Sequence, residues 1–277
     1  LRHGSGHGSG QALVVDMGGT TTDIALLHQG RPRLTARGAV VGGWRTCTRA
    51  ADIRTAGIGG DSHVRFEDGA LLVGPRRAIP LCLAAVEHPG LVDDLRRLRL
   101  APRKVSARGA PADFLTLIKS PDGLALSPTE ARLVEALADG PRSPAALAER
   151  LGLTHTVFLS SARLEGLEVV GRIGLTPTDV LHVEGMYTAW DAEAARLGAA
   201  ITAEAAGWEA GELVRKVKEA TIRKVALEIL TELICAEVGD DCAVPDGRVA
   251  DLLIRKALDG ADEGAAFEAI VRARGPL

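Results

Sequence analysis

Short apolar runs, separated by glycine-rich or polar turns, dominate the first quarter of the chain. Residues 12–15 form a continuous apolar run bounded by glycines, which predicts a buried strand over 11–16. A second run at 24–27 follows the segment MGGTTTD and precedes a turn at Gln29 and Gly30, so the two runs predict a hairpin with a polar tip. Further strands are expected at 53–58, 63–66 and 71–73, with a tight turn at 68–69.

A helix with a basic end is expected over 89–100. The cations that cluster there are Arg96, Arg97, Arg99, Arg103, Lys104 and Arg108. A solvated helix face is the favoured interpretation, because cations are stabilising near helix C-termini. Binding of an anion is the alternative, although a charge run alone is a weak signal for it.

The pattern becomes helical at Ser127, where Ser-Pro-Thr-Glu forms a capping box. Three helices are predicted, one after Ser127, one after Ser143 and one over 154–164, followed by a hairpin at 166–174. This order resembles a winged helix, whose functional interpretation is DNA binding. Residues 127–174 hold five arginines, six acidic residues and no lysine. Since phosphate contacts dominate affinity for nucleic acid, we favour a structural or protein-contact insert.

Helices are expected to fill the remainder of the chain. Thr176 caps one that ends at Gly185, and Asp191 caps an alanine-rich one that reaches about residue 206. A long helix at 211–238 is apolar on most faces, so we expect it to be buried. Two shorter helices are expected at 249–258 and 265–272.

Composition narrows the class of protein. The chain has 277 residues, of which 46% are hydrophobic and 25% charged, which excludes a disordered or collagen-like chain. The net charge of -3 argues against a nucleic-acid binder that relies on overall basicity, and no apolar run approaches the ~18 residues of a membrane-spanning helix. The four cysteines lack zinc-site spacing, and residues 1–10, expected to be a flexible lead-in, lack the apolar core of a signal peptide. These features favour a cytoplasmic protein with reduced cysteines.

Candidate chemistry begins at the segment that joins the first two strands. Gly18 and Gly19 allow a ligand to approach the backbone closely, and successive N–H groups there can hold an anion. The hydroxyls of Thr20, Thr21 and Thr22 can donate to phosphate oxygens. A glycine-rich turn is the plain alternative, but it does not explain why an aspartate stands at each end of the tract.

The two flanking aspartates are Asp16 and Asp23. Carboxylates repel phosphate, so they make sense if a divalent cation lies between them and the phosphates. One of them can also orient a nucleophile. A second glycine segment follows a strand-like run and is a candidate second wall of the same site: Gly59, Gly60, Asp61 and Ser62.

Three segments in order, VVDMGGTTTDIALL, TAGIGGDS and TPTDVLHVEG with Trp190 and Asp191 after it, resemble the hydantoinase/5-oxoprolinase family, A-type component. The resemblance implies a ribonuclease-H-like lobe of an actin-like, sugar-kinase-like ATPase fold. It also implies that ATP with Mg²⁺ phosphorylates the amide oxygen of a small cyclic amide, opening the ring to water, commonly with a B-type partner subunit. It assigns Asp16 and Asp23 to the metal and nucleophile, and the two glycine segments to the nucleotide.

The sequence departs from the family in ways that bear on domain organisation. An earlier aspartate and glycine motif and a later glycine-rich segment are absent, and the insert at 127–174 is foreign to the common core. We therefore expect a lobe formed by 11–126 and 175–277 that is incomplete without a second lobe. Alternatives are a small-molecule kinase or ATPase activator of the same fold, and a regulator that joins a sugar-kinase-like domain to a winged helix.

Overall fold

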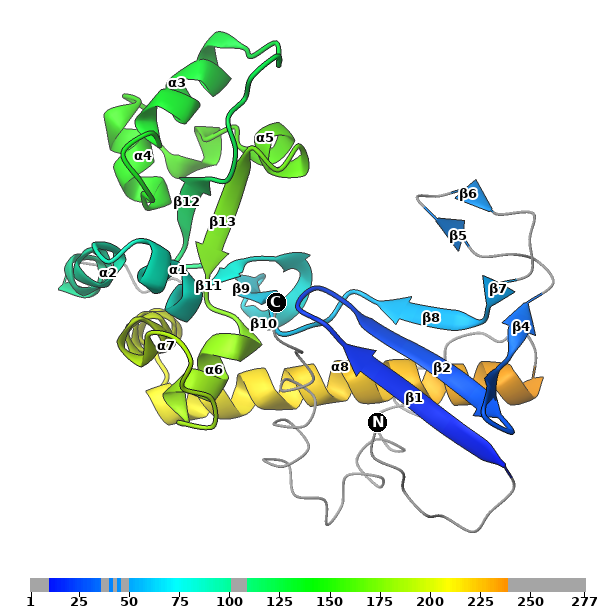
Figure 1. Cartoon of the computed structure of the whole chain (residues 1–277). Helices are drawn as coiled ribbons and strands as arrows, with labels where there is room; N and C mark the ends of the chain where they lie inside the picture. The colour runs from blue at the N-terminus through cyan, green and yellow to red at the C-terminus, as the bar shows by residue number, and fades with distance from the viewer. Residues whose placement is uncertain (1–9, 36–39, 42–43, 46–49, 101–108, 239–277) are drawn as a thin grey trace. The chain divides into compact units, whose positions relative to one another are not determined.

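The structure is a computed structural model, which describes residues 10–35, 40–41, 44–45, 50–100 and 109–238 (Figure 1). It is a mixed α/β protein whose chain forms two compact units. The first unit comprises Leu1–Gly59 and Ile222–Leu277, and the second comprises Gly60–Thr221. These boundaries differ from the predicted ones, and a separate insert at 127–174 stays a prediction.

A four-stranded antiparallel sheet forms the centre of the first unit. Strand β1 (Gln11–Met17) pairs with β2 (Thr22–His28), which also pairs with β8 (Ile53–Ala56) (Figure 1). Strand β2 pairs with the short strand β3 (Arg31–Pro32) as well. The predicted hairpin of β1 and β2 is confirmed. The turn predicted after it is confirmed too: Gln29 and Gly30, which connect β2 to β3, have φ values of 51° and 75°, as a tight hairpin turn requires. Two further strand pairs are β4 (Leu34–Thr35) with β7 (Ala50–Ala51) and β5 (Val40–Val41) with β6 (Trp44–Arg45).

Strand β1 is confirmed as a strand, but the prediction that it is buried is wrong. Leu13, Val14 and Val15 are each 37% exposed. The reason is that β1 lies at the edge of the sheet, where β2 is its sole partner among the described residues. Strand β2 has partner strands on both sides and is better covered, and its Ile24 is fully buried.

The second unit begins with a hairpin of β9 (Ser62–Glu67) and β10 (Ala70–Arg77). Its predicted turn is confirmed, with φ values of 50° at Asp68 and 80° at Gly69. A three-stranded sheet follows in the order β11 (Ile79–Pro80), β13 (Val170–Gly174), β12 (Phe114–Leu117), in which β11 runs parallel to β13.

Helices of the second unit cover this sheet in two groups. The first group is α1 (Leu81–Glu87), α2 (Leu91–Leu100), α6 (Pro177–Val183) and α7 (Ala192–Ala206), in which α7 packs against the other three. The second group is α3 (Pro128–Ala136), α4 (Pro144–Arg150), the 3₁₀ helix η1 (Thr156–Phe158) and α5 (Ala162–Gly166). Leu133, Leu147 and Leu164 of the second group share a core with Leu115 and Val170 of the sheet.

Two expectations for residues 154–174 are wrong. The single helix expected at 154–164 is split into η1 and α5, and the hairpin expected at 166–174 is one strand, β13. Residues 167–169 leave α5 through a turn with Glu168 at a φ of 55°. The strand that follows pairs with β12, more than fifty residues earlier in the chain, and no winged helix is shown.

The basic end of α2 is confirmed as a solvated, ion-paired helix face. Arg96 pairs with Asp93 and Glu193, Arg97 with Asp94, and Arg99 with Glu204. The helix begins at Leu91, and α1 precedes it as a separate helix that the sequence pattern missed. The other three cations of the predicted cluster lie outside the described residues.

The predicted long helix is confirmed as α8 (Ala210–Val238). In the first unit, its Glu228 accepts a hydrogen bond of 2.8 Å from Arg54 of β8, which ties the helix to the sheet. No helix in the described part of the chain is both long enough and apolar enough to cross a membrane. Residues 1–9 of the lead-in predicted at 1–10 and the helices predicted at 249–258 and 265–272 lie outside the described residues.

Candidate functional site

The loop between β1 and β2 is a four-residue connection. Met17 and Thr22 are opposite each other in the strand register, so residues 18–21 form the tip. The N–H of Gly18 donates to the carbonyl of Thr21 at 2.8 Å, which closes the loop. Within the described residues, the N–H groups of the three residues after Gly18 have no hydrogen-bond partner, so the tip has donors for an anion.

Asp16, Asp23 and Thr55 form a row across the sheet next to this loop. Asp16 is directly opposite Asp23, and Asp23 is directly opposite Thr55 of β8. Directly paired residues place their side chains on one face of a sheet, so the three side chains share a face. The Thr55 hydroxyl donates to Oδ1 of Asp23 at 2.6 Å. The row therefore places two like charges side by side, an arrangement that is destabilising without a cation.

The opposite face of the same strands is buried. Met17, Thr22 and Ala56, one step along the three strands, are 2%, 0% and 4% exposed. The Thr22 hydroxyl donates to the carbonyl of Ile58 at 2.7 Å, so its proton is used inside the protein. This bond holds Ile58, the residue before Gly59, beside β2.

The two glycine segments meet backbone to backbone at Gly59. A Cβ atom built on Gly59 would lie 2.4 Å from the carbonyl oxygen of Gly19 and 2.7 Å from that of Gly18. No side chain fits such an approach, which explains glycine at this position. Lys224 of α8 donates a hydrogen bond of 3.4 Å to the carbonyl of Gly57, two residues before Gly59. The structure thus brings together Asp16, Asp23, the loop and Gly59.

The remaining predicted site residues, Gly60, Asp61 and Ser62, belong to the second unit. The Gly60 carbonyl accepts two hydrogen bonds from Thr178, at 3.0 Å from its N–H and 2.8 Å from its hydroxyl. The Asp61 side chain is buried and lies 3.5 Å from the Arg77 guanidinium. Ser62 is buried at the start of β9. Thr178 belongs to the third motif, so that motif holds the second one in place.

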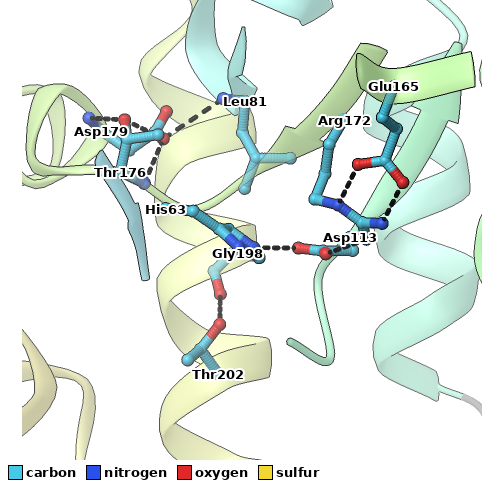
Figure 2. A network of polar contacts seen from close by, with 9 residues as sticks. All are labelled: His63, Leu81, Asp113, Glu165, Arg172, Thr176, Asp179, Gly198 and Thr202. Atoms are coloured by element: carbon cyan, nitrogen blue, oxygen red, sulfur yellow. Dashed lines mark hydrogen bonds and ion pairs between the residues drawn. The ribbon is translucent and has the colours of Figure 1, made fainter. Parts of the chain in front are cut away.

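Asp179, next to Thr178, caps two helices at once (Figure 2). It completes the predicted capping box of α6 by accepting from the N–H and hydroxyl of Thr176, both at 2.9 Å. The same carboxylate accepts from the backbone of Leu81 at 3.2 Å and of Cys82 at 2.8 Å, at the start of α1. Burial raises the pKa of the Asp179 carboxyl above its usual value, and burial beside Asp179 likewise raises the pKa of the Cys82 thiol.

A second polar network runs from β9 to α5 (Figure 2). His63 Nε2 and Asp113 Oδ1 are 2.8 Å apart, and Arg172 donates to Asp113 Oδ2 at 2.8 Å. Arg172 also binds both oxygens of Glu165, at 2.8 and 3.1 Å, and Ser161 donates to Glu165 at 2.6 Å. Burial raises the pKa of Glu165, but the hydrogen bonds from Arg172 and Ser161 outweigh burial and hold this pKa below its usual value.

Sequence reasoning missed this network, because its members are far apart in the chain. Asp113, Ser161 and Arg172 line a pocket of about 360 Å³ in the second unit. Close packing supports the network: a Cβ on Gly174 would lie 2.6 Å from Asp113 Oδ1. His63 Nδ1 is buried without a hydrogen-bond partner in the described structure.

Two other residues at the glycine segments were also missed, Thr55 and Lys224. Strand pairing could have indicated Thr55, because it is the first residue of the quoted segment TAGIGGDS and lies in a predicted strand, where it is a cross-strand candidate. Nothing local could have indicated Lys224, which lies more than 160 residues away. His182, which lies in the third motif, has a packing role: it is buried, its Nδ1 lies 2.9 Å from the Thr178 carbonyl oxygen, and its ring stacks on Trp190.

A family model described as Hydantoinase/oxoprolinase matches residues 2–82. No curated protein matches the chain. A solved structure of nucleotide-free acetone carboxylase, described with the mechanism of ATP-dependent acetone carboxylation, is similar at 15% identity and a TM-score of 0.25. That similarity covers 83% of this chain and 36% of the carboxylase chain, and it is too low to decide the fold. The family match spans both glycine segments, so residues 2–82 are similar to the hydantoinase/oxoprolinase family, which supports the resemblance predicted from the motifs.

Proposed function

We propose that the chain is an ATP-binding lobe, of the actin-like type, of an enzyme that opens a cyclic amide by phosphorylating its amide oxygen. The observation that carries the proposal is the acidic row beside the glycine loop. The Asp16 carboxylate has no hydrogen bond or ion pair within the described residues, while the loop beside it has backbone donors. Carboxylates and anion donors side by side are what a metal–phosphate group needs.

The donor set fits Mg²⁺ with a nucleotide better than a metal alone. Across the described residues, no group of three histidine, cysteine or acidic side chains is placed to hold a metal ion. Mg²⁺ usually takes one or two carboxylates and completes its shell with waters and phosphate oxygens, so Asp16 and Asp23 suffice when phosphates are present. When bound, Mg²⁺ and ATP would supply the phosphoryl group that activates the amide.

The chain's own residues have distinct parts in this proposal. The backbone of Gly19, Thr20 and Thr21 would donate to phosphate oxygens, and Gly18 closes the loop that presents them. Asp16 and Asp23 would hold the metal or orient the nucleophile. Thr22 acts from the buried face, by holding Ile58 and with it Gly59 against the loop.

Gly60, Asp61 and Ser62, the other residues predicted to face the nucleotide, belong to the second unit, where Thr178 anchors Gly60. We propose that a further lobe or a B-type subunit completes the enzyme, as the resemblance to the hydantoinase/5-oxoprolinase family implies. The cyclic amide substrate would bind to that lobe or subunit, or between it and this chain.

Calorimetric titration of the folded chain with ATP tests the site. We expect Mg²⁺-dependent binding that Asp16→Ala weakens at least about tenfold, as loss of a metal ligand or its support does. Asp122→Ala, which removes an exposed carboxylate of a loop in the second unit, serves as the control. If wild type and Asp16→Ala bind ATP equally well, the proposed site is wrong.

Product analysis tests the reaction. With the completed enzyme, ATP and 5-oxoproline or a hydantoin, we expect ADP to form in step with the opened ring. Release of a phosphorylated substrate with the ring intact would instead favour a small-molecule kinase.

A further inference from the structure

We infer that Thr55 is a positioning residue for the Asp23 carboxylate, and that it sets how strongly the site binds the metal of its nucleotide. This inference rests on the proposed function. Thr55 lies outside both glycine segments, on the strand that leads into the second one. Its hydroxyl reaches Asp23 from the side opposite to Asp16.

The hydrogen bond is directed at one oxygen of Asp23. The Thr55 hydroxyl donates to Oδ1 at 2.6 Å, and the described residues provide no other donor to either oxygen. A carboxylate held by one oxygen keeps the other available for a ligand, and the bond limits rotation of the group. A hydrogen bond to a charged acceptor is also among the stronger ones, so it persists at an exposed position.

The position of Asp23 makes this support necessary. Asp16 stands directly opposite on the neighbouring strand, and like charges in that position repel. Repulsion favours rotamers that separate the two carboxylates, whereas one shared metal requires them to converge. Thr55 offsets part of the cost of this repulsion, because its hydroxyl stabilises the negative charge of Asp23 from the far side.

An ordinary strand threonine is the plain alternative, since threonine is common in strands. That role depends on the β-branched shape, whereas positioning depends on the hydroxyl. Thr55→Val keeps the shape and removes the hydroxyl, and Thr55→Ser keeps the hydroxyl and removes a methyl. The two variants therefore separate the two roles.

The test is ATP binding by the full chain, titrated over a range of Mg²⁺ concentrations and repeated in EDTA. For Thr55→Val we expect the Mg²⁺ concentration at half-maximal ATP binding to rise about tenfold, in the range seen when support of a metal ligand is lost. Binding in EDTA should match the wild type, and Thr55→Ser should stay within about twofold of it. The matched control is Thr231→Val, which removes a hydroxyl that bonds the Leu227 carbonyl within α8.

The possible outcomes separate the positioning role of Thr55 from the proposed function of the chain. If Thr55→Val keeps the wild-type Mg²⁺ dependence, or weakens binding equally in EDTA, the positioning role is overturned. If Asp16→Ala loses Mg²⁺-dependent binding in the same experiment, the proposed function still stands. If the wild-type chain shows no Mg²⁺-dependent ATP binding, the proposed function fails and the role of Thr55 with it.

Discussion

The carboxylates of the two units differ in how much of their hydrogen-bonding capacity the protein uses. In the second unit, Asp179 accepts four hydrogen bonds and Glu165 three, all from within the unit. In the first unit, Asp23 accepts one, from Thr55, and Asp16 none within the described residues. All four are acidic residues close to motifs or pockets, so residue type alone does not separate them.

The difference separates structural from ligand-binding roles. A saturated, buried carboxylate stabilises the fold and has little capacity left for a ligand. An exposed carboxylate beside a like charge, with capacity left over, is unfavourable for folding and favourable for binding a cation. Asp179, in a motif that carried the family resemblance, is therefore assigned to the fold, and Asp16 to the proposed site.

The largest expected effect is on the stability of the second unit, where the protein uses the hydrogen-bonding capacity of Asp179. Asp179→Ala leaves the backbone N–H groups of Leu81, Cys82 and Thr176 buried without acceptors. At about 1–3 kcal/mol for each unsatisfied group, the free energy of unfolding should fall by at least about 3 kcal/mol. Urea denaturation followed by circular dichroism measures this, with Asp122→Ala as an exposed control. A loss no greater than that of the control would contradict the capping role.

A smaller effect, dependent on pH, is expected at Glu165. Its pKa is lowered in the folded protein, so its charge contributes stability above the unfolded value of about 4.3, and that stability is lost as pH falls through the folded pKa. Glu165→Gln should therefore lower the melting temperature at neutral pH, and the difference from wild type should shrink toward pH 3.

Thermal scans across that pH range check this prediction, and Glu87→Gln on the exposed end of α1 is the control. A difference that stays constant with pH would show that Glu165 acts through shape alone, without its charge.

The smallest effect on stability is expected at Asp16, where the substitution should stabilise the protein without Mg²⁺. Without Mg²⁺, Asp16→Asn removes the repulsion with Asp23 and should raise the melting temperature by about 1–3 °C. With Mg²⁺ and ATP the order should reverse, because the wild type binds more tightly and gains more stability from binding. Differential scanning fluorimetry in EDTA and in Mg²⁺–ATP measures both, with Asp122→Asn as the control. A variant less stable than wild type in EDTA would remove the contrast between the two units.

Local signals predicted the elements whose stability is local. The turns at 29–30 and 68–69, the capping boxes at Ser127 and Thr176 and the cap at Asp191 were all confirmed, because each depends on residues within a few positions. The same reasoning failed at 166–174, where β13 pairs with a strand from before the helical segment. No local pattern encodes that partner.

For the candidate site, the sequence by itself determined the residue types that metal and phosphate binding need, and their order along two strands. An antiparallel hairpin with a four-residue tip then puts Asp16 opposite Asp23, since the register follows from the turn. Tertiary structure alone decided that Thr55 supports Asp23, that Gly59 packs on the loop and that Thr178 holds Gly60. These contacts join segments 30 to 120 residues apart, and the free energy that brings them together comes from packing that no short stretch of sequence contains.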